Sequence, residues 1–178
     1  MAQVSADALE RAARLRLMVF DVDGVLTDGR LWFGPGGEAL KAFHVRDGHG
    51  LKLLAECGVA AALLTGRRSP ALSARAAELG LRHVLQGVED KRPAFERLLA
   101  QLGIEPGDAG YMGDDLPDLP VLAHCGFACA PPGAHALALR RAHYVADAPA
   151  GAGAAREVCE YVLGAQGRLE NALARYLA

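Results

Sequence analysis

Long apolar runs are absent from this sequence of 178 residues. No stretch approaches the ~20 consecutive apolar residues that a membrane-spanning helix needs. The first 20 residues mix acidic and arginine side chains with a short apolar run that ends at Phe20. They lack the apolar centre and the small-residue cleavage site of a secretory signal. We therefore expect a cytoplasmic protein that has no membrane partner.

An excess of basic residues is also absent, and so are paired metal-binding cysteines. Lys and Arg total 19 against 21 for Asp and Glu, so the formal net charge is −2 and no nucleic-acid partner is expected. The four cysteines are Cys57, Cys125, Cys129 and Cys159, and the second and third form a single C-x3-C. One such pair does not make a zinc site, so we expect free thiols in a reducing compartment.

Short apolar segments alternate with helical patterns along the chain. The expected strands cover residues 17–20, 59–64, 83–85, 109–112, 127–129 and 144–146. The expected helices cover residues 3–14, 48–57, 70–79, 91–102, 118–125, 134–142 and a longer stretch from 153 to 176. Alternation of this kind predicts a parallel sheet with helices on both faces. We therefore expect one α/β domain over residues 1–178 with a doubly wound, mostly parallel sheet.

One segment, residues 29–46, interrupts this alternation. Residues 30–33 and 39–45 have the pattern of two strands joined by a glycine-rich turn at 34–37. The segment carries the only tryptophan, Trp32, together with Phe33 and Phe43. An apolar hairpin needs a surface to pack against. Packing onto its own domain and pairing with copies from other subunits are the two alternatives, and we favour the second.

Polar side chains follow the expected strands at the points where the strands end. Of the 11 aspartates, seven fall near two of these points: Asp21, Asp23, Asp28, Asp47, Asp114, Asp115 and Asp118. Thr65 and Arg67 follow the second core strand, and Lys91 follows the third. Because ligands of open α/β sheets bind at the carboxyl ends of the strands, these groups are expected to meet there.

The chemistry of these groups suits a cation and an anion together. Carboxylates at this density repel one another unless a cation is bound, and oxygen ligands favour Mg²⁺. Lys91, Thr65 and Arg67 add positive charge and hydrogen-bond donors. The sequence therefore predicts a site for Mg²⁺ and a phosphate group at the carboxyl edge of the sheet.

The segment from Asp21 to Gly29, DVDGVLTDG, resembles the nucleophile loop of the haloacid dehalogenase superfamily. Thr65, Lys91 and residues 113–115 (GDD) follow in the order of that superfamily's other motifs. Residues 41–50 (KAFHVRDGHG), 65–67 (TGR), 113–116 (GDDL) and 155–159 (AREVC) are similar to one branch of it, the 3-deoxy-D-manno-octulosonate 8-phosphate phosphatase family. The resemblance covers nearly the whole chain. It implies a Rossmann-like core in which the short hairpin replaces a cap domain.

The resemblance also implies an activity and its cofactor. The activity is Mg²⁺-dependent phosphate ester hydrolysis through an aspartyl-phosphate, as a step in the synthesis of the lipopolysaccharide core sugar. Asp21 would be the nucleophile and Asp23 the general acid and base. The catalytic set would be Asp21, Asp23, Thr65 and Lys91. The metal set would be Asp21, Asp23 through its backbone carbonyl, and Asp114, with Asp115 and Asp118 orienting these groups.

A sugar acid phosphate carries a carboxylate as well as a phosphate group. The resemblance points to a substrate-binding set made up of Arg46, Asp47, Gly48, Lys52, Gly66, Arg67, Arg75 and Lys91. Lys52 and His44 stand where relatives often carry arginine and asparagine. The family further implies a homotetramer in which four hairpins form a central β-barrel and each neighbour helps to complete a site. Residues 164–169 are expected either to form a tail that reaches a neighbouring site or to continue an ordinary terminal helix.

Other functions fit parts of this pattern. The same chemistry on a nine-carbon keto-deoxy sugar acid 9-phosphate is the main alternative. A catalytically idle relative that serves as an assembly module is a second, although Asp21, Asp23, Lys91 and Asp114 are all present. A phospho-receiver domain is a third, but there an adjacent acidic pair follows the first strand, whereas here Asp21 and Asp23 are separated by one residue.

Overall fold

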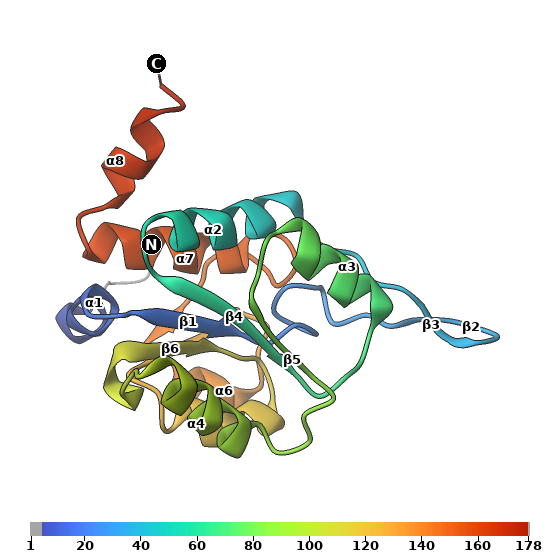
Figure 1. Cartoon of the computed structure of the whole chain (residues 1–178). Coiled ribbons are helices and arrows are strands. Elements are labelled where there is room, and N and C mark those ends of the chain that lie inside the picture. Colours follow the sequence, from blue (N-terminus) through green and yellow to red (C-terminus); the bar gives the residue numbers. More distant parts are fainter. Residues whose placement is uncertain (1–4, 178) are drawn as a thin grey trace.

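A six-stranded parallel sheet forms the centre of the computed structural model, which describes residues 5–177 (Figure 1). In chain order its strands are β1 (Leu17–Phe20), β4 (Ala60–Thr65), β5 (His83–Gln86), β6 (Ala109–Met112), β7 (Phe127–Ala130) and β8 (Tyr144–Val145). Their spatial order is β5-β4-β1-β6-β7-β8, and every pairing is parallel. The doubly wound sheet expected from the sequence is confirmed.

Strand β1 lies at the switch point of this sheet. Its four residues are all apolar and buried, as expected for a strand that has neighbours on both sides and helices on both faces. Met18 pairs in register with Ala61 of β4 on one side and with Gly110 of β6 on the other. The chain extends the sheet first through β4 and β5 and then crosses to β6 on the far side of β1. Ligand sites of such folds lie where the order reverses, here at the carboxyl ends of β1 and β6.

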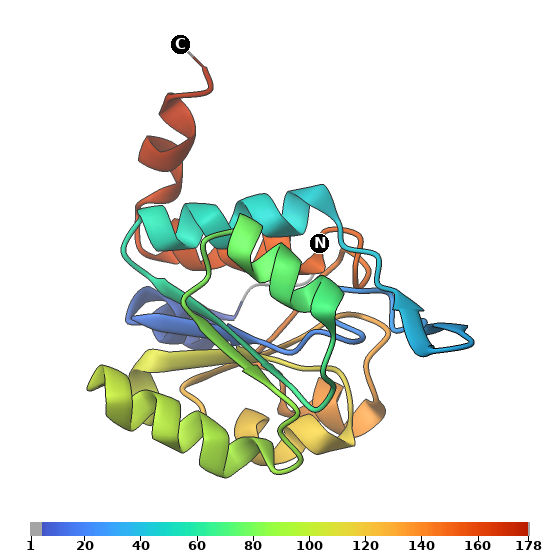
Figure 2. The same ribbon diagram turned by 45° about the vertical axis from the view of Figure 1, so that its right-hand side comes forward.

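Helices cover both faces of the sheet (Figures 1 and 2). On one face lie α1 (Ala6–Ala13), α2 (Val45–Glu56), α3 (Pro70–Glu78) and α7 (Ala154–Ala165). On the other lie α4 (Lys91–Leu102), α5 (Leu119–Leu122) and α6 (Ala136–Arg141). Two 3-10 turns, η1 (Pro106–Asp108) and η2 (Leu116–Asp118), precede β6 and α5. None of the helices within residues 5–177 is both long and apolar enough to cross a membrane.

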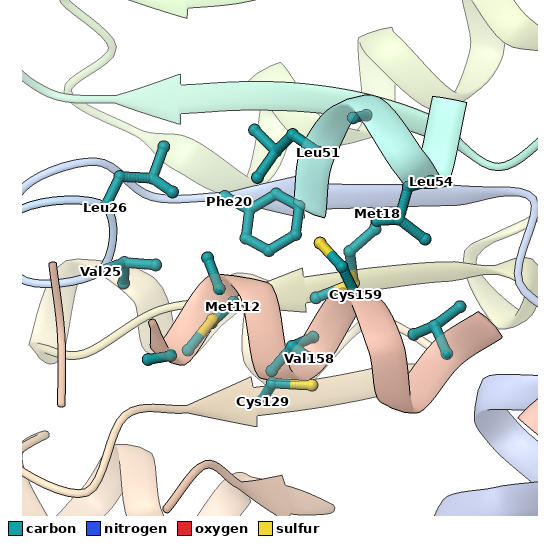
Figure 3. Packing of buried hydrophobic residues seen from close by; sticks show 14 of the residues in the cluster. Met18, Phe20, Val25, Leu26, Leu51, Leu54, Met112, Cys129, Val158 and Cys159 are labelled. Carbon is teal, nitrogen blue, oxygen red and sulfur yellow. The ribbon is translucent and has the colours of Figure 1, made fainter. Parts of the chain in front are cut away.

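The larger core lies between the sheet and the pair α2 and α7 (Figure 3). Phe20 of β1 and Met112 of β6 extend from the sheet toward Leu51 of α2 and Val158 of α7. Cys159 of α7 and Cys129 of β7 are buried free thiols in the same cluster, and Cys125 is a buried free thiol in the core on the opposite face. Burial raises the pKa of these three thiols, that of Cys125 to about 12, so they remain protonated and pack as small apolar groups.

The hairpin is shorter than expected. Its strands are β2 (Trp32–Gly34) and β3 (Gly37–Leu40), whereas a strand was expected as far as Val45. That expectation is wrong because α2 already begins at Val45, where the ring nitrogen Nδ1 of His44 accepts the backbone N–H of Arg46 at 3.2 Å and caps the helix. The hairpin extends away from the body of the domain (Figure 2), and Trp32, Phe33 and Leu40 are 54%, 65% and 66% exposed.

The helical prediction over residues 153–176 is wrong in one respect. The chain forms two helices there, α7 and the short α8 (Leu169–Ala174), which projects from the body of the domain (Figure 1). Gly167 has a φ of 64°, a left-handed conformation that ends the first helix and redirects the chain. The helix expected over residues 118–125 is also broken, into η2 and the single turn of α5. The leading helix begins at Ala6, and residues 3 and 4 lie outside the described part of the chain.

Candidate active site

An open pocket lies at the carboxyl ends of β1, β4 and β6. Its lining includes every catalytic and metal-binding residue expected from the sequence, together with Gly66 and Arg67 of the substrate-binding set and the two orienting aspartates: Asp21, Asp23, Thr65, Gly66, Arg67, Lys91, Asp114, Asp115 and Asp118. Gly24, Gly29, Val88, Glu89 and Pro117 complete it. Asp21 and Asp23 follow β1, Thr65 ends β4, Lys91 opens α4, and Asp114 follows β6. Four separate segments therefore deliver polar groups to one rim, as the strand-end argument predicts.

Lys91 is the buried cation at the base of this pocket. Its ammonium Nζ lies 2.9 Å from Asp21 Oδ2 and 2.6 Å from Asp118 Oδ1. Burial alone would lower the pKa of Lys91, but the negative charges of Asp21 and Asp118 outweigh that effect and raise it. Lys91 therefore stays charged, and its ammonium faces the place where an anion would sit.

Asp118 is held by donors on every side. Its Oδ1 accepts hydrogen bonds from Lys91 and from the hydroxyl of Tyr111, the latter at 2.6 Å. Its Oδ2 accepts the backbone N–H groups of Asp114 at 2.9 Å and of Asp115 at 3.1 Å. Both oxygens are occupied, so this carboxylate is suited to fixing the loop and the lysine rather than to binding a ligand. The burial of Asp118 supports the orienting role expected for it.

Asp21 and Asp114 are the two other carboxylates that lie close to Asp118 in the pocket. One oxygen from each, with one from Asp118, forms a group whose atoms all lie within 4.8 Å of one another. Burial and the nearby charge of Asp118 raise the pKa of Asp21 to about 7, with Lys91 acting against the rise. Burial and the charges of Asp118 and Asp115 raise the pKa of Asp114 to about 7 as well. Crowded oxygen donors of this kind match the preferences of Mg²⁺, which would relieve their repulsion.

The loop after β1 is shaped to let Asp114 approach. Gly24 has a φ of 82°, and a Cβ atom placed on it would lie 2.1 Å from Asp114 Oδ2. The hydroxyl oxygen of Thr27 accepts the backbone N–H groups of Gly24 and Gly29, each at 3.3 Å, which closes the loop on itself. A side chain at position 24 would therefore occupy the space between the two carboxylate-bearing loops.

Thr65 and the two residues after it form part of the pocket wall. Thr65 is buried, and its hydroxyl oxygen accepts the backbone N–H of Arg67 at 3.3 Å. Gly66 and Arg67 also line the pocket. This turn leaves a hydroxyl, a backbone segment without a side chain and a guanidinium near one another, which are donors suited to phosphate oxygens.

Lys41 is a site residue that sequence reasoning missed. Its ammonium donates a hydrogen bond to Asp23 Oδ1 and lies 3.6 Å from Glu38 Oε2. Its side chain is only 3% exposed, although it begins just past the end of the exposed hairpin. The available signal was its position at the start of the KAFHVRDGHG segment, in a chain that has only three lysines.

Five of the expected substrate-binding residues lie outside this pocket, four on α2 and the last on α3: Arg46, Asp47, Gly48, Lys52 and Arg75. Asp47 is 1% exposed, and its carboxylate accepts the backbone N–H groups of Gly153 at 3.2 Å and Arg156 at 2.9 Å. Gly48 packs so closely on Arg75 that a Cβ there would lie 2.3 Å from the guanidinium. Within one chain, Asp47 therefore has a structural setting, and Lys52 faces solvent along α2.

Comparison with known proteins defines the family. No family model matches the chain. The chain is 47% identical over 169 residues to 3-deoxy-D-manno-octulosonate 8-phosphate phosphatase from Yersinia pestis, covering 95% of this chain and 90% of that protein. The chain belongs to the 3-deoxy-D-manno-octulosonate 8-phosphate phosphatase family of the haloacid dehalogenase superfamily.

Solved structures related to this phosphatase family have the same fold. The protein of this family from Moraxella catarrhalis, in complex with magnesium ion, phosphate ion and KDO, is 38% identical with a TM-score of 0.93, covering 96% of this chain and 98% of that one. A probable phosphatase from Pseudomonas syringae is 45% identical with a TM-score of 0.95, covering 98% of this chain and 99% of that one. The family resemblance expected from the motifs is thus confirmed over almost the whole chain.

Proposed function

We propose that this protein is a Mg²⁺-dependent phosphatase that removes the phosphate group from 3-deoxy-D-manno-octulosonate 8-phosphate. One observation carries the proposal: two carboxylates on adjacent loops, Asp21 and Asp114, converge beside the buried ammonium of Lys91 in the pocket. The Moraxella relative, solved with magnesium, phosphate and KDO, supports this choice of metal and substrate. The proposal includes a cytoplasmic step in making the lipopolysaccharide core sugar, and the free thiols suit that compartment.

The metal-binding part of the proposal assigns Mg²⁺ to the carboxylates of Asp21 and Asp114 and the backbone carbonyl of Asp23. The fit is supported by the two raised pKa values and by the space that Gly24 leaves beside Asp114. Bound Mg²⁺ would neutralise charge between the nucleophile and the phosphate and polarise the phosphoryl group. Asp118 is left out of the ligand set because both of its oxygens already accept hydrogen bonds.

The reaction proceeds in two displacements at phosphorus. A carboxylate oxygen of Asp21 forms a bond to phosphorus while the ester P–O bond breaks, and Asp23 gives its proton to the departing sugar oxygen. Water then attacks the aspartyl-phosphate, Asp23 takes a proton from that water, and the bond to Asp21 breaks. Lys91 and Thr65 bind the phosphoryl oxygens, where negative charge is spread in the transition state.

Recognition of the sugar acid uses a second anionic group on the substrate. Arg67 lines the pocket and can pair with a carboxylate there. Arg46, Lys52 and Arg75 do not line the pocket of their own chain, and we propose that they act on the site of a neighbouring copy. The exposed Trp32, Phe33 and Leu40 of the hairpin support such an assembly, and we propose the homotetramer that the family resemblance implies.

The test compares kcat/KM for the eight-carbon sugar acid 8-phosphate, a nine-carbon keto-deoxy sugar acid 9-phosphate and simple sugar phosphates, with Mg²⁺ and after chelation. We expect the eight-carbon substrate to be preferred and activity to stop on chelation. The control variant Asp21→Asn should lower kcat at least ~1,000-fold while circular dichroism shows an intact fold. Preference for the nine-carbon compound would overturn the substrate assignment, and full activity of Asp21→Asn would overturn the assignment of Asp21 as the nucleophile.

A further inference from the structure

The contact between Lys41 and Asp23 joins the hairpin segment to the catalytic loop. Asp23 has a side chain that is 21% exposed and lines the pocket, whereas the Lys41 side chain is 3% exposed. The lysine ammonium also lies 3.6 Å from Glu38 on β3. A cation is thus placed between one carboxylate of the hairpin and one of the active site. The two residues of the contact are 18 positions apart in the chain.

The backbone of the catalytic loop is fixed by other contacts, but these do not orient the Asp23 side chain. Thr27 binds the N–H groups of Gly24 and Gly29, and the N–H of Leu26 donates to the carbonyl of Val22 at 2.9 Å. These bonds set the path of the main chain and leave rotation about the side-chain bonds of Asp23 free. Lys41 supplies the contact that restricts this rotation by holding Oδ1. The second oxygen, Oδ2, is thereby left for a reacting group in the pocket.

We propose that Lys41 is a positioning residue that orients the general acid and base Asp23 for proton transfer, with Glu38 anchoring the lysine to the hairpin. This inference rests on the proposed phosphatase function. Proton transfer in a transition state requires the acid within hydrogen-bond distance of the leaving oxygen, and small misplacements are costly in rate. Lys41 provides that restraint, because its side chain is nearly buried and its packed aliphatic part leaves the ammonium little freedom to move away.

A positioning role for Lys41 can be distinguished from a role in substrate binding, because only the positioning role makes the effect of a variant depend on the leaving group. A sugar alkoxide is a poor leaving group and needs a proton as the ester bond breaks, whereas p-nitrophenolate leaves without one. The value of kcat/KM reports the steps up to phosphoryl transfer to Asp21, so it isolates the acid step from the later attack of water. Loss of a positioning residue for the acid therefore slows alkyl phosphates selectively. Loss of a phosphate-binding or structural residue slows both classes.

The experiment measures kcat/KM of wild type, Lys41→Met and Lys41→Arg with glycerol 3-phosphate and with p-nitrophenyl phosphate. We expect Lys41→Met to lower kcat/KM about 100-fold for the alkyl ester and less than about threefold for the aryl ester. Lys41→Arg, which keeps the charge and can donate to both carboxylates, should recover most of the loss. Arg30→Met is the matched control. It removes a cation from the same segment, but the side chain of Arg30 is 78% exposed.

Equal losses on both esters, or no loss on either, would overturn the positioning role. Should Lys41→Met fail to fold by thermal unfolding and circular dichroism, Glu38→Gln probes the same contact from the hairpin side and should shift the ratio of the two kcat/KM values in the same direction. Neither ester is a sugar acid, so the comparison stands even when the eight-carbon substrate proves wrong. Failure of the proposed function appears instead in the substrate panel with the wild-type protein.

Discussion

Two aspartates separated by one residue have opposite surroundings in this protein. Asp21 is buried against Lys91, and burial raises its pKa to about 7. Asp23 is more exposed, and its carboxylate pairs with Lys41 from the hairpin segment. Different surroundings are how one site gives two carboxyl groups separate tasks. Under the proposed mechanism, the loop after β1 thus places Asp21 toward the metal and phosphate and Asp23 toward the leaving group.

The raised pKa values of Asp21 and Asp114 predict a proton-linked Mg²⁺ affinity. Each carboxyl must lose its proton to bind the ion, and each has a pKa near 7 in the metal-free protein. We expect the apparent Mg²⁺ dissociation constant to rise at least about tenfold for each pH unit below 7. Isothermal titration calorimetry in buffers of different ionisation enthalpy counts the protons released. An affinity that is unchanged from pH 5 to pH 8 would contradict this.

The same pKa shifts determine whether the stability of the metal-free protein rises or falls with pH. A carboxyl whose pKa is raised in the folded state stabilises the fold while it is protonated, and that contribution is lost as pH rises through its folded pKa. With a chelator present, the contribution of these two groups should therefore lower the melting temperature as the pH is raised from 5 to 8. Added Mg²⁺ should raise the melting temperature more at pH 8 than at pH 5. In the variant Asp114→Asn, the melting temperature should depend less on pH and less on added Mg²⁺.

Sequence reasoning reached Asp21, Asp23, Thr65, Lys91 and Asp114 because each stands at the end of a recognisable strand. The parallel sheet then brings strand ends together without further information. Lys41 was out of reach for a physical reason. Its contact with Asp23 depends on the path of the chain as it returns from the hairpin, which the motif around Lys41 does not specify. The exclusion of Asp118 from the proposed metal ligands likewise depends on four hydrogen-bond donors that only the folded loop brings together.

At the scale of helices and strands, the apolar runs located the six core strands within a residue or so. Two of the boundaries that failed did so at capping residues. His44 starts α2 early by accepting a backbone N–H, and Gly167 ends the α7 segment through a positive φ. Both effects depend on a single residue, whereas periodicity is an average over many. Periodicity therefore predicts that an element exists better than it predicts where the element stops.

Asp47 joins two such elements, and this predicts how its variants behave. Its carboxylate accepts two N–H groups at the beginning of α7 while it sits in the first turn of α2. Asp47→Asn keeps the size but offers only one acceptor oxygen, so one buried N–H loses its partner. We expect the free energy of unfolding to fall by about 1–3 kcal/mol, with KM for the sugar acid phosphate little changed. Urea unfolding and steady-state kinetics measure the two quantities.

The control for Asp47→Asn is Asp90→Asn. Asp90 is exposed before α4, and its side chain makes no capping hydrogen bond. We expect its free energy of unfolding to change by less than about 0.5 kcal/mol. A large rise in KM for Asp47→Asn with unchanged stability would return Asp47 to the substrate-binding set in which the sequence placed it.

At the scale of the whole molecule, the hairpin is the feature that a single chain does not explain. It extends from the domain with Trp32 and Phe33 more than half exposed, although each would gain about 1.5–3 kcal/mol from full burial (Figure 2). Its inner end meets the catalytic loop through Lys41 and Glu38. A hairpin held by neighbouring copies at its tip would be held more firmly at its base. Assembly and proton transfer are thereby expected to be linked.

The double variant Trp32→Ser and Phe33→Ser tests this link. We expect sedimentation velocity to show dissociation toward monomers, because the apolar contact between hairpins is lost. We further expect kcat/KM for glycerol 3-phosphate to fall more than kcat/KM for p-nitrophenyl phosphate, in the same direction as for Lys41→Met. Leu9→Ser, which removes an exposed apolar side chain from α1, should leave the sedimentation coefficient unchanged. A wild-type protein that is already monomeric would exclude assembly, and a dissociated variant that keeps both kcat/KM values would separate assembly from the catalytic acid.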